Sequence, residues 1–212
     1  MYAPALFAES RPDVLHSLVR AHPLGMLVTQ RAAGLEVDHL PFLLNPEGTE
    51  AHPLGTLQAH VARANPVWQE VREGDAVLVV FRGAEGYISP NWYASKPETH
   101  RHVPTWNYEA VHVHGRLHIR EDEKFLRGVL ARLTRVHEAD QPVPWRMGDA
   151  PADYLRDMLG QIVGIEVDIT RIEGKRKLSQ NREPRDFAST LQALDERGSV
   201  QLAAAMRRSQ KG

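Results

Sequence analysis

Hydrophobic and polar residues alternate along several short segments of the chain, a pattern typical of β-strands with one buried face. In Ala110–Arg120 the apolar residues fall on one face and the histidines and arginines on the other. Ile162–Ile172 alternates in the same way, and Ala76–Arg82 is a nearly all-apolar run of strand length. Three further strands are predicted at Leu24–Gln30, Leu35–Leu44 and Leu54–Val61.

Between these strands apolar residues recur at helical spacing, so amphipathic helices are predicted as well. Ser10 is the expected N-cap of the first helix, Asp122 of the long central one and Ser199 of the last. The predicted helices cover residues 11–22, 66–71, 122–138, 151–159, 183–197 and 200–208.

The order of these elements favours an α+β fold that is mainly β. Six or seven strands with hairpin-type links and few long crossovers predict an antiparallel sheet closed into a small barrel, with helices packed outside it. We expect one main domain over residues 1–182. Residues 183–212 are predicted to form a C-terminal helical extension that packs on the barrel or on a dimer partner.

Composition narrows the function classes. The chain has 212 residues, a formal net charge of −1 and no cysteine. The absence of cysteine excludes disulfides, thiolate metal sites and cysteine nucleophiles, and the charge gives no global signal for a polyanionic partner. We see no signal peptide and no apolar run of the roughly 18 residues needed to span a bilayer. A soluble, cytoplasmic protein without a membrane partner is therefore expected.

The segment 86–108 is rich in aromatic residues. It holds two of the four tryptophans, three of the five tyrosines and three prolines. The prolines exclude one continuous helix. Rings interleaved with hydroxyls and amides suit a pocket wall or a platform for a flat ligand. A rigid aromatic corner over the core of a β-structure is the alternative that the pattern leaves open.

Other polar groups suggest chemistry less specifically. His112, His114 and His118 share a strand face at a spacing that zinc sites use, but no acidic residue is interleaved, so we expect a polar face and no metal site. Four cations within Lys175–Arg182 suit an anion, or equally a solvated basic turn. His39 lies among apolar residues, where a half-buried histidine bonded to backbone is the simpler interpretation. Phosphate-binding glycine loops and a hydrolase Gly-x-Ser-x-Gly motif are both missing.

Five blocks of sequence together resemble the PaiB family, described as FMN-binding negative transcriptional regulators. They are Val37–Leu44 (Val-Asp-His-Leu-Pro-Phe-Leu-Leu), His60–Pro66, Tyr87–Tyr93 (Tyr-Ile-Ser-Pro-Asn-Trp-Tyr), Pro104–Tyr108 (Pro-Thr-Trp-Asn-Tyr) and Lys177–Arg182. The resemblance runs in the same order from about residue 1 to residue 208.

The resemblance implies an FMN-binding split β-barrel of the pyridoxamine-phosphate-oxidase type. Such proteins are usually homodimers with flavin bound where the subunits meet, and the family label is that of a repressor of degradative-enzyme and sporulation genes. As FMN-contacting residues it suggests aromatic rings, short polar side chains and cations. These are His39, Ser89, Trp92, Tyr93, Lys96, Thr105, Trp106, Asn107, Tyr108, Lys177, Gln180, Asn181 and Arg182.

Two other functions stay open beside the regulator. One is a flavin-dependent oxidoreductase acting on a small molecule, for which no catalytic residue is identified. The other is a haem-binding protein in which His112 or His114 supplies an axial ligand. DNA is a partner by the family label alone, because no helix-turn-helix is evident and the net charge offers no basic footprint.

Overall fold

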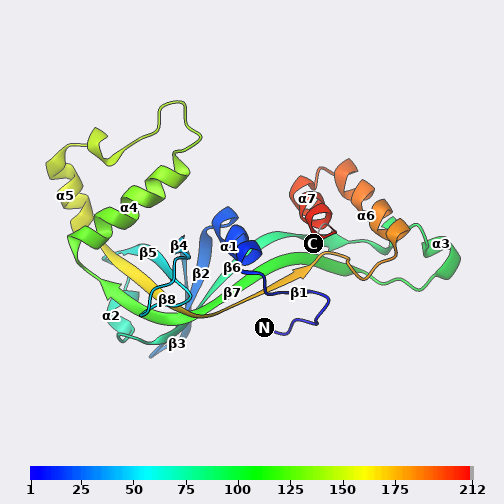
Figure 1. The fold of residues 1–212 in the computed structure, drawn as a ribbon, viewed down its shortest axis with the longest axis horizontal. Coiled ribbons are helices and arrows are strands. Elements are labelled where there is room, and N and C mark those ends of the chain that lie inside the picture. The colour runs from blue at the N-terminus through cyan, green and yellow to red at the C-terminus, as the bar shows by residue number, and fades with distance from the viewer. Residues whose placement is uncertain (211–212) are drawn as a thin grey trace. The chain divides into compact units, whose positions relative to one another are not determined.

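The computed structural model describes residues 1–210 as one antiparallel sheet of eight strands with helices beside it (Figure 1). The strand order is β3-β2-β6-β7-β8-β5-β4, and β1 pairs with β8. The predicted split β-barrel of α+β type is confirmed, although the sheet is not fully closed. No helix within residues 1–210 combines the length and apolar character needed to cross a bilayer.

The predicted elements occur in the predicted order, while β1, α3 and the two 3₁₀ turns were not predicted. The strands are β1 (Ala8–Glu9), β2 (Leu24–Arg31), β3 (Gly34–Pro41), β4 (Leu43–Asn45), β5 (Thr56–Ala62), β6 (Ala76–Ile88), β7 (Thr105–Arg120) and β8 (Ile162–Lys177). The helices are α1 (Pro12–Ala21), α2 (Val67–Glu70), α3 (Lys96–Thr99), α4 (Glu123–His137), α5 (Ala152–Gly160), α6 (Pro184–Glu196) and α7 (Val200–Ser209), with 3₁₀ turns η1 (Pro90–Trp92) and η2 (Met147–Asp149).

The chain forms two compact units, each assembled from separate segments. The first contains Met1–His22, Phe81–His112 and the chain from Glu173 onward, and the second contains Pro23–Val80 and Val113–Ile172. Strands β6, β7 and β8 therefore contribute residues to both units.

The first unit buries a cluster between its strands and its last two helices. Ile88 and Leu178 are fully buried together with Leu194 of α6 and Met206 of α7. Both helices were predicted, from Gly198 closing the first and Ser199 capping the second, and in this cluster their apolar faces lose contact with water. Of the C-terminal extension predicted over residues 183–212, the last two residues lie outside the described part of the chain.

The second unit has its own core. Leu27 of β2, Val79 of β6 and Val113 of β7 are fully buried, as are Val163 and Ile165 of β8. The predicted apolar face of β7 is confirmed, since Val113 and Leu117 are both buried. Helix α4 buries Leu126, Val129 and Leu133, and Asp122 caps it as predicted by accepting from the Phe125 N–H at 2.7 Å.

Two details of the prediction were wrong. Leu35–Leu44 is not one strand but breaks at Phe42, because Pro41 has no N–H to donate and the Phe42 N–H donates instead to the Pro23 carbonyl at 2.8 Å. The N-cap of α1 is Arg11, without a side-chain cap, rather than Ser10. Ser199 is the N-cap of α7 as predicted, although its side chain makes no capping hydrogen bond.

Strand β6 is longer than predicted, extending past Arg82 to Ile88. Gly83 and Gly86 interrupt the apolar pattern that marks its first half. Both glycines lie where neighbouring side chains leave no room for a larger residue. A Cβ at Gly83 would lie 2.9 Å from the Glu109 Cβ, and one at Gly86 would lie 2.9 Å from a Leu202 methyl group. These glycines thus serve close packing rather than a turn.

Gly115 gives a test of strand packing in the second unit. A Cβ there would lie 2.4 Å from the Asp168 carbonyl oxygen, which is backbone of the neighbouring β8 and cannot swing away. Gly115→Ala should lower the free energy of unfolding by about 1–3 kcal/mol, measured by urea denaturation. Gly160→Ala is the control, because nothing lies within 4 Å of its added Cβ. Equal stability of the two variants would contradict the packing.

Candidate functional site

The aromatic segment 86–108 is held entirely within the first unit. It begins at the end of β6, passes through the turn η1 and the single-turn helix α3, and ends in β7. The prediction that no continuous helix crosses it is confirmed. Strand geometry therefore sets side-chain direction at its two ends, while its middle depends on particular hydrogen bonds.

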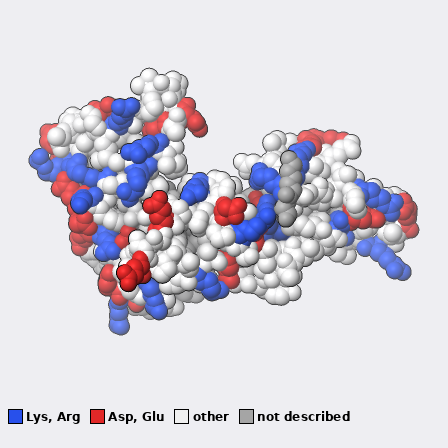
Figure 2. Space-filling view, in the orientation of Figure 1, with Lys and Arg blue, Asp and Glu red and all other residues white. Residues whose placement is uncertain are grey.

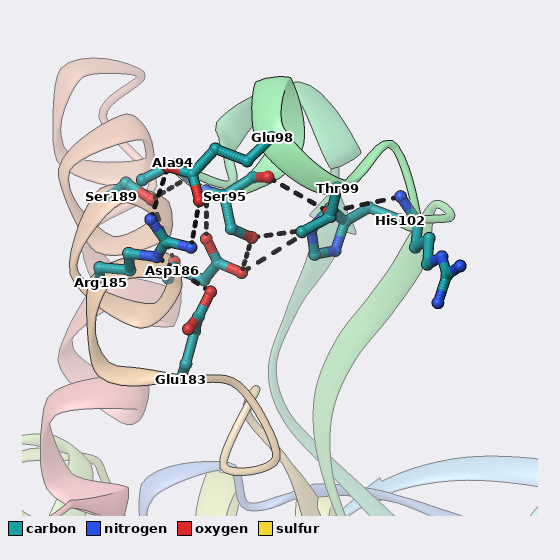
Figure 3. A network of polar contacts seen from close by, with 10 residues as sticks. Ala94, Ser95, Glu98, Thr99, His102, Glu183, Arg185, Asp186 and Ser189 are labelled. Atoms are coloured by element: carbon teal, nitrogen blue, oxygen red, sulfur yellow. Dashed lines mark hydrogen bonds and ion pairs between the residues drawn. The ribbon is translucent and has the colours of Figure 1, made fainter.

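A polar clamp ties the middle of this segment to α6 (Figure 3). Asp186 accepts hydrogen bonds from the Ser95 backbone N–H at 2.8 Å and from the Ser95 hydroxyl at 2.7 Å. The Ser95 Oγ also lies 2.8 Å from His102 Nε2. Ser95 and Asp186 are each only 1% exposed although 91 positions separate them. The clamp thus fixes α3 and the following loop on α6.

Serine, histidine and aspartate meet here, but not in the order of a hydrolase triad. A nucleophilic serine gives its proton to a histidine whose other nitrogen bonds to the aspartate. In this clamp Ser95 stands in the middle and donates to Asp186, while His102 Nε2 is 4.0 Å from the carboxylate. Ser95 is buried and its hydroxyl already donates to Asp186, so its role is to hold the loop in place.

Tyr93 belongs to the same buried region. It is 2% exposed, the Arg182 guanidinium lies 4.4 Å from the centre of its ring, and the His102 ring lies 4.8 Å away. Burial raises the pKa of the Tyr93 hydroxyl. Two residues predicted to contact FMN, Tyr93 and Arg182, therefore pack against each other inside the first unit.

Strand alternation separates the residues at the start of β7 into two sets. Asn107 and Glu109 point into the first unit, at 0% and 2% exposure. The Asn107 amide donates to the Ser179 Oγ at 2.8 Å, and Glu109 accepts from the Arg176 Nε at 2.8 Å. Asn107 is thus a buried anchor between strand and C-terminal segment, with partners inside the protein.

The other set forms an exposed surface that we call the outer aromatic face. Trp106 and Tyr87 are each 47% exposed, and their rings meet edge to face with centroids 6.4 Å apart. Tyr108 follows Trp106 at the same side of the strand. The face comprises Tyr2, Tyr87, Trp106, Tyr108, Lys175 and Lys177.

Two lysines lie among these rings. The Lys175 ammonium is 5.3 Å from the centre of the Tyr108 ring and 5.6 Å from that of Tyr2. Lys177 donates to the Trp106 carbonyl at 3.0 Å and to the Thr105 hydroxyl. Partial burial lowers the pKa of Lys177. The outer aromatic face therefore offers flat apolar surface and positive charge side by side.

The remaining predicted residues fall elsewhere. Ser89 caps η1 by accepting from the Asn91 N–H at 3.2 Å, and Lys96 donates to the Asn91 side chain. Trp92 is partly buried against the core of the first unit, with the Arg197 guanidinium 5.1 Å from its ring centre.

Gln180 is used within its own turn, where it accepts from the Leu178 N–H at 2.7 Å and donates to the Arg176 carbonyl at 2.6 Å. Asn181 is exposed in the turn after β8. His39 belongs to the second unit, where it is exposed on β3 opposite Met26. The structure thus gathers Trp106, Tyr108 and Lys177 on one face, with the Thr105 hydroxyl bonded to Lys177, and gives most of the others local structural partners.

Sequence reasoning missed three members of the face: Tyr2, Tyr87 and Lys175. A signal existed for one of them, because Lys175 lies two positions before Lys177 in a strand and therefore shares its side. Tyr87 stood inside a quoted motif but was not assigned a role. Nothing in the local pattern marks Tyr2, whose carbonyl accepts from Lys175 at 3.1 Å.

Comparison with known proteins identifies the family of this chain. A family described as "Putative FMN-binding domain" matches residues 1–171. The chain belongs to this family. The Bacillus subtilis relative named protease synthase and sporulation protein PAI 2 is 30% identical over 195 residues, which cover 92% of this chain and 89% of the relative. Membership of the PaiB family, inferred from five sequence blocks, is confirmed.

Solved structures agree on the fold. The flavocytochrome Anf3 from Azotobacter vinelandii superposes with a TM-score of 0.61 at 14% identity, covering 86% of this chain and 75% of the other. The FAD and heme binding protein from Mycobacterium smegmatis also gives 0.61, at 15% identity, covering 86% and 78%. At such low identity these matches concern the split-barrel fold alone.

The clamp predicts a pH-dependent stability. Burial alone would raise the pKa of Asp186, but the hydrogen bonds from Ser95 and the nearby His102 outweigh it and lower the pKa below its usual 3.8. A lowered pKa stabilises the fold above the pKa of the unfolded chain, and that stability is lost as the pH falls through the folded value. Asp186→Asn should therefore cost about 1–3 kcal/mol at pH 7.

The difference between Asp186→Asn and wild type should shrink below about pH 4, as followed by urea unfolding across the acid range. Asp195→Asn is the control, because Asp195 is exposed and pairs with Arg207 at the surface. A cost at Asp186 that stays constant down to pH 2.5 would contradict the assigned carboxylate role.

Proposed function

We propose that this protein binds FMN on the outer aromatic face of the first unit. The observation that carries the proposal is the exposure of Trp106 and Tyr87 beside two ammonium groups. A soluble protein gains nothing in its own stability from leaving such large rings in water, so an exposed aromatic group ringed by polar side chains marks a binding surface.

The chemistry of this face fits the cofactor. The isoalloxazine of FMN is flat and stacks on aromatic rings, which Trp106 and Tyr108 supply. The FMN phosphate requires cations, and Lys175 and Lys177 are the two on this face. Thr105 adds a hydroxyl held by Lys177. When bound, FMN supplies one-electron and hydride chemistry. The residues of this chain bind and orient it.

For the biological role we propose an FMN-binding regulator of the PaiB type. The name of the relative from Bacillus subtilis refers to protease synthesis and sporulation, and the sequence similarity covers nearly the full length of both chains. The proposed regulation acts through the flavin-bound state rather than through a broad basic surface. Figure 2 shows basic and acidic side chains interspersed over the face in view.

The arginines of the segment Lys175–Arg182 support the proposal that regulation does not act through a broad basic surface. Arg176 is 7% exposed and pairs with Glu109 at 2.8 Å and with Glu9 at 3.5 Å. The Arg182 guanidinium packs on the ring of Tyr93. Cations engaged in this way within the protein are poorly placed to grip the phosphates of DNA.

FMN binding should depend on the outer aromatic face. Titration of purified protein into FMN, followed by quenching of flavin fluorescence, should give saturable binding. Trp106→Ala should weaken it about tenfold or more, because about 1–3 kcal/mol of stacking is lost. The Lys175→Ala/Lys177→Ala double variant should weaken FMN far more than riboflavin, which lacks the phosphate. Tyr154→Ala is the matched aromatic control, because Tyr154 is a 54% exposed ring in the second unit. Unchanged affinity in Trp106→Ala would contradict the assigned face.

The regulatory role predicts little catalysis. FMN-loaded protein should oxidise NADH or NADPH no faster than the same concentration of free FMN, measured by absorbance at 340 nm. A regulator that only responds to bound flavin needs no site for a reductant beside the flavin. Turnover at least tenfold above the free-flavin rate would reject the regulator in favour of an oxidoreductase.

A further inference from the structure

The second unit holds two neighbouring cavities that share part of their lining. The smaller, of about 310 Å³, is lined by Pro41, His60 and α4 residues including Leu130 and Leu133. The larger, of about 580 Å³, lies between α4 and the loop that follows it. Trp145, Thr134 and Glu138 line both cavities. Pro41 and His60 come from two different sequence blocks of the family, neither of which the outer aromatic face uses.

Four polar residues line the smaller cavity, namely His60, Thr134, His137 and Glu138, and His60 is the one with a buried polar atom that lacks a partner. Its Nδ1 is buried and has no hydrogen-bond partner among residues 1–210, and burial lowers the pKa of the ring. The neutral tautomer with a lone pair on Nδ1 avoids burying an unpaired N–H. In that tautomer Nε2 carries the proton and is available as a donor to a ligand in the smaller cavity, which His60 lines.

The other residues that line the cavity restrict which ligands could accept a hydrogen bond from His60. Leu130, Leu133 and Pro41 present apolar surface, and the Trp145 indole is 43% exposed. The Trp145 backbone N–H donates to the Glu138 carboxylate at 3.0 Å, which ties the end of the loop between α4 and η2 back to the end of α4. The Glu138 charge at the rim disfavours anions. A cation is disfavoured in turn by the His60 N–H, which is a donor without a lone pair, and the Trp145 indole and the α4 leucines suit a flat apolar ring, so a neutral, flat ligand fits best.

We propose that this cavity binds a small, planar, uncharged aromatic molecule with a carbonyl-type hydrogen-bond acceptor. The ring packs between the α4 leucines and Trp145, and the acceptor receives the His60 N–H. Because the argument uses no residue of the outer aromatic face, the site stands independently of FMN binding there.

Menadione is a suitable probe, since it is a flat two-ring quinone with two carbonyl acceptors. Quinones add to thiols, but this chain contains no cysteine to interfere. 2-Methylnaphthalene is the matched probe with the same rings and no acceptor. Calorimetric titration of the full-length protein should give saturable binding of menadione about tenfold tighter than of 2-methylnaphthalene, the advantage expected from one hydrogen bond.

Three variants locate the site. His60→Leu should remove the tenfold advantage of menadione and leave 2-methylnaphthalene unchanged, while Trp145→Ala should weaken both probes about tenfold or more. His16→Leu is the control, because His16 is also a partly buried histidine with a lowered pKa but lies on α1. It should change neither probe. Thermal melting by circular dichroism checks that each variant folds.

Equal affinity of wild-type protein for the two probes, or no saturable binding of menadione, would overturn the proposal, and this comparison needs no variant. Loss of binding in Trp106→Ala with none in Trp145→Ala would also overturn it, because the quinone would then occupy the outer aromatic face. Either result leaves the FMN titration to be judged separately.

Discussion

The period-two geometry of β7 is the constraint on which the first unit depends. Successive side chains of a strand leave on opposite sides, so the run Trp106-Asn107-Tyr108-Glu109 must divide. Asn107 and Glu109 go inward to Ser179 and Arg176. Trp106 and Tyr108 must then go outward, and a one-residue slip would place two charged or amide groups in water and two rings against buried polar partners.

The buried polar side of the strand makes that arrangement hard to slip. Glu9, Arg176 and Glu109 form a chain of ion pairs, each less than 10% exposed. Removing one partner would leave a buried charge without its counter-ion. The resulting loss of stability is much larger than the net stabilisation that the ion pair provides. The Ser95–Asp186 clamp acts in the same way on the loop between β6 and β7. The aromatic face thus rests on a scaffold whose register is set by interactions on its opposite side.

Local pattern predicted the strands, helices and family, because apolar period and short motifs are carried by neighbouring residues. It failed to divide the aromatic segment into core and surface. Tyr93 follows a 3₁₀ turn, where no simple period sets its direction, and its partner Arg182 is 89 positions away. Asp186 gave no sign that it would bind Ser95. Trp106 and Lys177 both lie within strands, so the face of the sheet on which each side chain lies could have been predicted from the alternation of residues. What the sequence concealed is mainly long-range polar pairing.

The central claim is that FMN lies against Trp106, and the indole N–H signals of the four tryptophans test it directly. In a ¹⁵N-labelled sample these four signals are resolved by two-dimensional NMR and assigned by replacing each tryptophan in turn with phenylalanine. On addition of FMN, the signal of Trp106 should move most, because a stacked flavin ring shifts the nuclei beside it. A large shift at Trp68 or Trp145 of the second unit, with Trp106 unmoved, would contradict the account.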